Sequence, residues 1–301
     1  MKNIVTVLVC LLGLAWPCCA GQAAPRYAVA EIPTPVLNTP EIAAVFGKTL
    51  QTDSCGQLRA MEFVAMPGTV FTIEAVMTRG ARTLYRVNSA DYPYPTRSGY
   101  FIDSRFVRVT EKKPPERTRQ LPPKETVIDN LLAAQGSRYV WGGNRRSGLP
   151  EMLSLYPPAD SAPLTPDTAA LRQLRGVDCS GLLFEATNGF TPRNTSALIG
   201  YGKAVRIAGL SAERIIERVE PLDLIVWRGH VIIILDRERT IESRLDCGGT
   251  KGGVVVRPLR ETLAGVMTGR MAVNDLGDAG ERGKKGFVIR RWYAGYPSVP
   301  Y

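Results

Sequence analysis

Apolar and polar residues alternate in the first third of the chain. Between positions 71 and 75, Phe, Ile and Ala are separated by Thr and Glu, which is the period of a half-buried strand. A glycine turn at 79–81 leads into a further strand pattern. The strands expected in this way lie at 71–75, 83–87, 100–102 and 106–109, the last two on either side of a tight turn at Asp103-Ser104. Because no helical period interrupts them, residues 25–111 are predicted to form a small β-barrel.

The spacing of apolar residues changes to that of helices after residue 124. Thr126 is expected to N-cap a helix that closes at Gly136, and Thr165 to N-cap a helix that ends at Gly176. A third helix is expected to begin at Cys179. Five strands follow, at 222–227, 231–235, 240–243, 253–256 and 287–292. Because the helices precede the strands rather than alternate with them, the fold class predicted for residues 125–301 is α+β.

A proline-rich, charged segment separates the two patterns. Residues 112–124 contain almost no apolar side chain, so they are predicted to form an extended, exposed linker between two domains.

The N-terminus has the order of an export signal. Lys2 precedes an apolar run at 4–16, and small residues follow it. The run is too short to cross a hydrocarbon core of about 30 Å, so residues 1–24 are interpreted as a cleaved signal peptide. The mature protein is therefore expected to be periplasmic or secreted, without stable membrane insertion. The alternatives are an N-terminal membrane anchor and a lipid attached at Cys18 or Cys19.

Charge and composition narrow the partners. The formal net charge of +10 favours an acidic partner such as an anionic wall polymer, unless it serves solubility alone. No aromatic-rich nucleic-acid motif accompanies this charge, so nucleic acid is not expected as a partner. Neither a metal nor a cofactor is expected, and the oligomeric state is left open.

Three cysteines follow the leader, namely Cys55, Cys179 and Cys247. An odd count in an exported protein suggests one free thiol, so Cys55 and Cys247 are predicted to form a disulfide between the two domains. Cys179 follows Asp178, a natural N-cap, and is placed in the first turn of a helix, whose dipole favours the thiolate. The alternative is a buried structural thiol, which is the usual fate of a free cysteine.

His230 is the only histidine of the chain, and it opens the strand pattern of 231–235. A cysteine nucleophile with a histidine base must therefore use this residue. The hairpin turned by residues 236–239 returns Glu242 toward the same end, where a carboxylate would orient the imidazole and stabilise its cation. The alternative for Glu242 is a solvated strand residue.

These residues belong to a set of short motifs that resembles the NlpC-type cell-wall peptidases, a papain-like group. In chain order the motifs are Tyr139-Val140-Trp141-Gly142-Gly143, Asp178-Cys179-Ser180-Gly181, Thr191-Pro192-Arg193-Asn194-Thr195-Ser196, Pro221-Leu222-Asp223-Leu224-Ile225 and Gly229-His230-Val231. Each motif is short, but the five occur in the order of the family and cover most of residues 125–301.

The resemblance implies a papain-like catalytic domain, with helices packed on an antiparallel sheet. It implies that Cys179 is the nucleophile, His230 the base and Glu242 the third polar residue, a position where the family more often has His, Asn or Gln. The residues implied to meet the substrate are Tyr139, Trp141, Asp178 and Ser180. The implied substrate is a peptidoglycan stem peptide, cut between γ-D-glutamate and a diamino acid.

Two further segments bear on this resemblance. Residues 99–107 are similar to the closing strands of bacterial SH3-like domains, which implies a targeting or substrate-positioning module, with a plain spacer as the alternative. Residues 144–176 separate two motifs that are close together in the family. This inserted segment is expected to lid or narrow the cleft, unless it extends over the surface away from the site.

The function predicted from these observations is that of an exported cysteine endopeptidase, a thiol protease of the cell wall. One alternative is an acyltransferase or lipid-directed thiol hydrolase on the same scaffold. Another is a non-catalytic wall-binding protein with a relic catalytic domain, against which the intact Cys179 and His230 argue.

Overall fold

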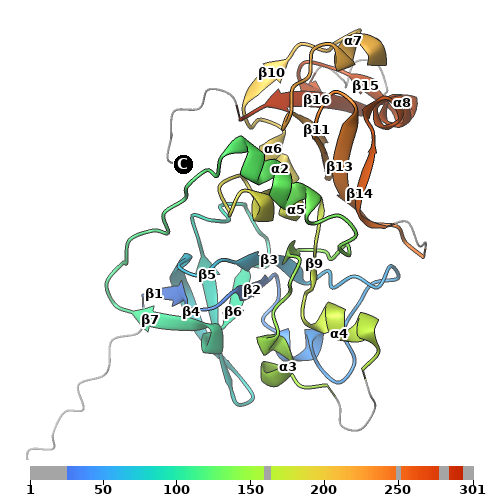
Figure 1. Ribbon diagram of the computed structural model, residues 1–301. Helices are drawn as coiled ribbons and strands as arrows, with labels where there is room; N and C mark the ends of the chain where they lie inside the picture. Colours follow the sequence, from blue (N-terminus) through green and yellow to red (C-terminus); the bar gives the residue numbers. More distant parts are fainter. Residues whose placement is uncertain (1–25, 159–163, 249–251, 278–284, 294–301) are drawn as a thin grey trace, which may run out of the picture.

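Two antiparallel sheets with helices between them organise the chain, a mixed α/β arrangement (Figure 1). The computed structural model describes residues 26–158, 164–248, 252–277 and 285–293. The expected signal peptide, residues 1–24, lies outside the described residues. None of the helices within these ranges is long and apolar enough to cross a membrane.

The first sheet has seven strands in the order β3-β2-β6-β5-β4-β1-β7, and every pairing is antiparallel. Its elements are β1 Tyr27–Ala30, β2 Thr34–Leu37, α1 Ile42–Val45, β3 Met61–Ala65, β4 Val70–Arg79, β5 Arg82–Asn88, β6 Tyr100–Asp103, the 3-10 helix Ser104–Phe106 and β7 Val107–Thr110. All four strands expected before residue 112 lie in this sheet. Its SH3-like character stays a prediction.

The alternation in β4 holds only over its first half. Phe71 is buried and Ile73 partly buried, as expected, whereas Ala75 is exposed. The reason is a register shift between Ile73 and Ala75 in the pairing with β5, because an extra residue reverses the face of those that follow. The expected tight turn after Asp103 is a 3-10 helix, and Asp103 caps it by accepting a hydrogen bond from the backbone of Arg105.

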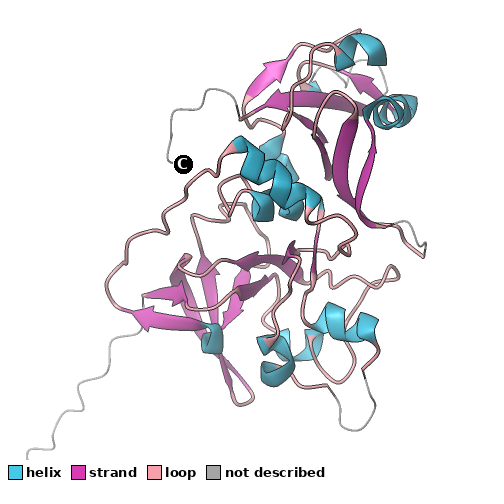
Figure 2. Cartoon of the chain, in the orientation of Figure 1, coloured by secondary structure: helices cyan, strands magenta, loops and turns pink. Residues whose placement is uncertain are grey.

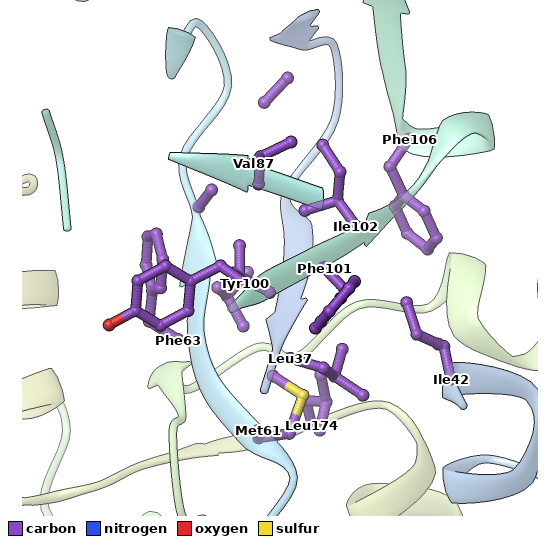
Figure 3. Packing of buried hydrophobic residues seen from close by; sticks show 14 of the residues in the cluster. Leu37, Ile42, Met61, Phe63, Val87, Tyr100, Phe101, Ile102, Phe106 and Leu174 are labelled. Carbon is purple, nitrogen blue, oxygen red and sulfur yellow. The ribbon is translucent and has the colours of Figure 1, made fainter. Parts of the chain in front are cut away.

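The inserted segment packs into the core of the first sheet (Figure 3). Its helices are α3 Glu151–Leu155 and α4 Pro166–Arg172. Met152, Tyr156 and Leu174 join the buried cluster of the strands, and the Arg172 guanidinium donates to the carbonyls of residues 46–48 at 2.7–3.1 Å. The described part of residues 144–176 is therefore a structural component of the first core and not a loose surface excursion.

The two-stranded sheet of β8 Asn144–Arg145 and β9 Gly176–Val177 closes the base of this insertion. Asn144 pairs with Val177, so the chain leaves the second region and returns to it at one point. The tyrosine motif and the cysteine motif, separated in sequence, are thereby adjacent in space.

The second sheet has the order β10-β16-β11-β12-β13-β14, with β15 pairing parallel to β16. Its strands are β10 Lys203–Val205, β11 Leu224–Trp227, β12 His230–Ile234, β13 Arg239–Arg244, β14 Gly253–Pro258, β15 Arg270–Ala272 and β16 Lys285–Arg291. All five strands predicted after residue 179 occur, and each begins and ends within two residues of its expected bounds.

Helices cover both faces of the second sheet (Figure 2). Val231 and Ile233 pack in one buried cluster with Leu182 of α5, whereas Ile232 and Ile234 pack in another with Leu263 of α8. This double burial explains why β12 is a continuous apolar run rather than an alternating one. The covering helices are α2 Lys124–Leu132, α5 Cys179–Ala186 and α6 Thr195–Leu198 on one side, and α7 Ala212–Ile216 and α8 Leu259–Gly269 on the other.

The helices differ from the expected ones in three respects, namely two boundaries and one additional helix. α2 begins at Lys124 with Pro123 at the N-cap, so the assignment of Thr126 as the cap is wrong. Thr165 does cap α4, but this helix ends at Arg172 because Leu174 has a φ of 51°, which a helix cannot contain. α8 lies after β14, so the order of helices first and strands later is incomplete.

The linker is extended but attached at both ends (Figure 1). The Arg117 and Arg119 guanidinium groups both pair with buried Asp91 of the first region, at 3.3 and 2.5 Å. Arg117 also donates to the carbonyl of Gly189, which follows α5, at 3.0 Å. The expected exposed spacer is therefore a strap that holds the two regions together.

A disulfide joins the two regions on the opposite side. Cys55 precedes β3 and Cys247 follows β13, and their Cα atoms are 4.8 Å apart. The pairing predicted from the odd thiol count is confirmed, and Cys179 is the free cysteine of the described residues.

Candidate active site

Cys179 is the first residue of α5, as its sequence context predicts. The Asp178 side chain accepts a hydrogen bond from the Gly181 backbone at 2.7 Å and so caps the helix. Cys179 is 7% exposed and lies against the second sheet. The expected helix start is confirmed.

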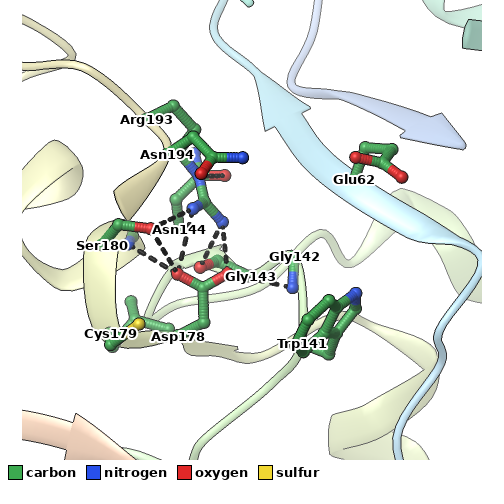
Figure 4. A network of polar contacts seen from close by, with 12 residues as sticks. Glu62, Trp141, Gly142, Gly143, Asn144, Asp178, Cys179, Ser180, Arg193 and Asn194 are labelled. Carbon is green, nitrogen blue, oxygen red and sulfur yellow. Dashed lines mark hydrogen bonds and ion pairs between the residues drawn. The ribbon is translucent and has the colours of Figure 1, made fainter. Parts of the chain in front are cut away.

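Asp178 is also the centre of a buried polar network (Figure 4). Both terminal nitrogens of Arg193 donate to its carboxylate, at 2.9 and 2.8 Å, and the Gly142 backbone donates at 3.1 Å. The Ser180 hydroxyl donates to Asp178 at 3.3 Å and accepts from Arg193 at 3.0 Å. The side chains of Asp178 and Ser180 therefore hold the start of α5 in place, and their contact with substrate stays a prediction.

Arg193 extends this network to the first sheet. Its Nε donates to Asn144 Oδ1 at 3.2 Å. The Asn144 amide in turn accepts from the backbone N–H of Val64 in β3 and donates to the Val64 carbonyl, both at 2.9 Å. A side-chain amide thus completes the edge of β3 and fixes the first sheet relative to the cysteine helix. Sequence reasoning placed Arg193 in a family motif without giving it a role, because its partners lie far away in the chain.

Two glycines let the chain pass through this crowded corner. Gly142 has a φ of +70°, and a Cβ there would lie 2.8 Å from the Met61 side chain. A Cβ on Gly181 would lie 2.0 Å from the carbonyl oxygen of Gly143. Close approach of the tyrosine motif to α5 therefore requires both.

His230 and Glu242 form a hydrogen-bonded pair across β12 and β13. The Nε2–Oε2 distance is 2.7 Å. Ile233 lies opposite Ile241, so this register brings Glu242 to the same end of the hairpin as His230. The predicted juxtaposition is confirmed, and Glu242 is 5% exposed rather than a solvated strand residue.

This pair defines the state of the imidazole. A carboxylate only accepts hydrogen bonds, so Nε2 carries the proton and Nδ1 of the neutral ring keeps its lone pair. Burial alone would raise the pKa of Glu242, but the hydrogen bond and charge of His230 outweigh it and lower that pKa. Arg244 and Arg257 lower it further.

Cys179 lies against the backbone on either side of His230. Its Sγ is 3.9 Å from the carbonyl oxygen of Gly229, and the Val231 N–H is also directed to it. Within the described residues no hydrogen bond joins this Sγ to the His230 ring. Cys179 therefore contacts the backbone at the start of β12, directly beside the residue that carries the candidate base.

The expected stabilisation of a Cys179 thiolate is wrong for this structure. Burial, followed by the nearby charge of Asp178, raises the pKa of the thiol to about 12. Arg193 and backbone N–H groups act in the opposite direction but do not compensate. The helix start alone predicts a low pKa, whereas the loss of water around the sulfur has the larger effect. The resting thiol is therefore neutral.

Tyr139 and Trp141 lie on the approach to this cysteine. Burial, Asp178 and Cys179 all raise the pKa of Tyr139, so its hydroxyl stays protonated. Trp141 is 37% exposed, and its backbone N–H donates to Gln57 Oε1 of the first region at 3.0 Å. Both residues are accessible in part, as contacts with a substrate require.

A cavity of about 480 Å³ borders Tyr139. The loop of Cys55 and Gln57 forms one side of it, and Asp167 and Leu171 of α4 form another. The inserted segment therefore lines the space beside the tyrosine, and its expected role as a lid or constriction of the substrate cleft stays a prediction.

Trp227 is a neighbour of the candidate base that sequence reasoning missed. It is the register partner of His230 across β11 and β12, and the centres of the two rings are 5.1 Å apart. The Arg270 guanidinium also lies over the Trp227 ring, 4.4 Å from its centre. The signal in the sequence was the aromatic residue that ends the strand pattern of 222–227, shortly before His230.

Comparisons with known proteins give partial similarity only. No family model matches the sequence, and no curated protein matches it. Among solved structures, the chain is similar to the peptidoglycan hydrolase RipB of Mycobacterium tuberculosis, with 25% identity over 45% of this chain and 57% of RipB and a TM-score of 0.30. The match thus spans little more than half of RipB.

Two other solved structures match to a similar degree. RipD of Mycobacterium tuberculosis, described as a non-catalytic NlpC/p60 domain protein adapted to peptidoglycan binding, is 20% identical over 45% of this chain and 86% of its own, with a TM-score of 0.30. A cysteine mutant of the Resuscitation Promoting Factor Interacting protein RipA is 19% identical over 56% of this chain and 61% of its own, with a TM-score of 0.31. The functional assignment rests on the residues of the site itself.

Proposed function

We propose that the protein is an exported cysteine endopeptidase that hydrolyses peptidoglycan stem peptides. The observation that carries this proposal is the 2.7 Å pair of His230 and Glu242 next to a cysteine held at the start of a helix. A relic domain has no need to keep a buried carboxylate on its single histidine. The free Cys179, beside a disulfide that uses the other two described cysteines, supports the same assignment.

The first chemical step follows from the neutral resting thiol. Nδ1 of His230 takes the proton from Cys179 as the sulfur attacks the carbonyl carbon of the scissile amide. Glu242 holds the ring through Nε2 and stabilises the imidazolium that forms. The oxygen of the tetrahedral intermediate is stabilised by the Cys179 backbone N–H.

The second step returns the proton. The imidazolium protonates the leaving amine, the C–N bond breaks, and an acyl-enzyme remains on Cys179. His230 then takes a proton from water as its oxygen attacks the thioester carbonyl. The C–S bond breaks, the imidazolium returns the proton to the sulfur of Cys179, and the carboxylic acid product leaves.

The substrate class is proposed from the five motifs that resemble the NlpC-type peptidases. The bond is the one between γ-D-glutamate and a diamino acid, with Tyr139 and Trp141 in contact with the peptide. Export agrees with the leader pattern of residues 1–24 and with the Cys55–Cys247 disulfide, because such bonds persist in oxidising compartments.

The first sheet is proposed to limit which stem peptides enter. Glu62 of β3 lies across from Trp141 and the Asp178 network (Figure 4). Asn38 and the Tyr92 hydroxyl donate to its two carboxylate oxygens, at 2.9 and 3.0 Å. A carboxylate held in this way is suited to a free ammonium group, so stems with a free amino end are favoured over crosslinked ones.

Digestion of purified cell wall, followed by mass analysis of the released fragments, tests the proposal. Fragments that end in γ-D-glutamate, absent with the Cys179→Ala variant, are the expected result. Release of fatty acid, or acyl transfer without cleavage, would favour the lipid-directed alternative. Wall binding without any fragment would favour the non-catalytic one.

A further inference from the structure

Arg59 lies in the loop before β3 and stacks on Trp141 of the tyrosine motif. We propose that Arg59 is a specificity-determining residue which binds the free α-carboxylate of the γ-linked D-glutamate, on the acyl side of the scissile bond. This inference rests on the proposed function and specifies which chemical group of the substrate the first region recognises.

The loop that carries Arg59 is held by several independent contacts. Asp53 Oδ1 accepts hydrogen bonds from the backbone of Cys55 at 2.9 Å and of Gln57 at 2.8 Å. Cys55 is tied to Cys247 by the disulfide. Asp53 Oδ2 accepts from Arg59 Nε at 2.5 Å. The position of the guanidinium is thus set before any ligand arrives.

The guanidinium also stacks on the residue next to the cysteine corner. Arg59 Cζ lies 4.1 Å from the Trp141 ring centre, and Gln57 Oε1 receives the Trp141 N–H. Gly142, the next residue, donates to Asp178, which precedes Cys179. Arg59 is therefore linked to the nucleophile through one aromatic ring and one hydrogen bond. The charges of Arg59, Asp178 and Cys179 all act on Tyr139, in agreement with this placement.

The exposed end of Arg59 has the chemistry of a carboxylate receptor. Asp53 is bonded to Nε, and the side chain is 41% exposed, so the two terminal nitrogens are available to a ligand. Two parallel N–H groups of a guanidinium match the two oxygens of a carboxylate, and stacking on an aromatic ring preserves that planar geometry.

The proposed substrate carries a carboxylate in the right place. In a γ-linked D-glutamate the chain continues through the side-chain carboxyl, so the α-carboxylate is free and only a few bonds from the scissile carbonyl. Arg59 is stacked on Trp141, whose neighbour Gly142 donates to the residue before Cys179, and is therefore the cation assigned to bind it. Amidation of this group gives D-isoglutamine, which has the same shape without the charge.

The experiment compares two stem tripeptides, one with γ-D-glutamate and one with D-isoglutamine. Turnover of both is measured with the full protein and with Arg59→Gln. Arg79→Gln is the matched control, because Arg79 has a similar exposure of 43% and also pairs through Nε, with Glu41 at 3.1 Å, but lies on the β4–β5 hairpin. Arg59→Lys keeps the charge and loses the planar fork.

We expect Arg59→Gln to lower kcat/KM for the acidic tripeptide by about 10- to 100-fold, mainly through KM, which is the usual effect of losing a charge-assisted hydrogen bond. The D-isoglutamine tripeptide should change little, Arg59→Lys should fall between, and Arg79→Gln should match the parent protein. Equal losses on both tripeptides, or none on either, overturn the role of Arg59.

A binding measurement separates this inference from the proposed function. If the parent protein turns over neither tripeptide, the endopeptidase assignment fails. Titration calorimetry of the acidic tripeptide into Cys179→Ala, with and without Arg59→Gln, then still decides the role of Arg59. Weaker binding only when Arg59 is replaced supports the carboxylate contact, and unchanged or absent binding rejects it.

Discussion

Two buried carboxylates lie on either side of the candidate nucleophile, and each has a different basic partner. Asp178 is paired with Arg193 at the start of α5, whereas Glu242 is paired with His230 on the second sheet. Both pairs are 2.7–2.8 Å long. Their difference lies in the partner. Arg193 is permanently charged and 3% exposed, whereas the His230 side chain is 19% exposed and its imidazole can accept and return a proton.

This contrast separates a scaffold from a reactive group. Asp178 receives hydrogen bonds from Arg193, Ser180 and two backbone groups, which hold its carboxylate in one position. Glu242 holds one nitrogen of His230 and leaves the other for chemistry. A pair that cannot change its protonation fixes geometry, and a pair that can change it moves protons.

The largest effect on activity is expected from removal of the reactive groups. Cys179→Ala and His230→Ala should each lower turnover of a stem tripeptide by several orders of magnitude, because nucleophile and base act as one unit. Thermal unfolding of Cys179→Ala should stay close to that of the parent protein, whereas His230→Ala also leaves the buried Glu242 without its partner and should unfold at a lower temperature. Substantial turnover by either purified variant contradicts the assignment.

Removal of the scaffold partner should act on stability instead. Arg193→Met leaves Asp178 buried with an uncompensated charge, so the free energy of unfolding should fall by about 3–5 kcal/mol. Denaturant titration measures this loss. The double variant Arg193→Met with Asp178→Asn should recover part of it, because the amide can still cap α5. A loss below about 1 kcal/mol would show that the network is not a scaffold.

The disulfide connects the loop of Arg59 to the loop that follows β13, the strand of Glu242, so its removal tests how the two regions depend on each other. Replacing Cys55 and Cys247 together by Ser should lower the free energy of unfolding by about 2–5 kcal/mol. Alkylation of Cys179 in the native protein should be little changed. A faster alkylation would mean that the disulfide also keeps water from the thiol.

Glu242→Gln tests the partner of the reactive histidine and should have a smaller effect on activity. The amide oxygen still accepts from Nε2, but the charge that stabilises the imidazolium is lost, so activity should fall less than in His230→Ala. Activity indistinguishable from that of the parent protein at every pH would place the orienting residue elsewhere.

The same variant has a pH signature. Because the folded-state pKa of Glu242 is lowered, its charge stabilises the fold above its ordinary pKa, and this contribution disappears as pH falls through the lowered value. The difference in unfolding free energy between parent and Glu242→Gln should therefore be largest near neutral pH and shrink in acid. An unchanged difference down to strongly acidic pH contradicts the pairing.

The smallest expected effect concerns the first sheet. Glu62→Gln should reduce the preference for stems with a free amino end by a few-fold, measured as the ratio of kcat/KM on free and N-acetylated tripeptides. Deleting the first sheet is not an equivalent test, because Met152 and Tyr156 of the inserted segment are buried in its core. An unchanged ratio would reduce the first sheet to a spacer or wall anchor.

Local sequence determined the elements and the identities of the reactive groups. The Asp178 cap, the Cys179 helix start and five of the seven strands of the second sheet follow from patterns within a few residues. A single histidine and three cysteines after the leader left few possible pairings, so both His230 and the Cys55–Cys247 disulfide could be named in advance. The pair of His230 and Glu242 was also predictable, because β12 and β13 are consecutive in the chain and form one hairpin.

Tertiary structure decided the environment of those groups. The pKa of Cys179 depends on desolvation by the second sheet, which opposes the local preference of the helix start. Arg193, Trp227 and Arg59 acquired their places through partners from other elements, and the inserted segment joined a core that begins more than a hundred residues earlier. Cap and strand preferences act over a few residues, whereas burial and charge pairing depend on segments distant in the chain, which is why sequence named the reactive atoms but not their surroundings.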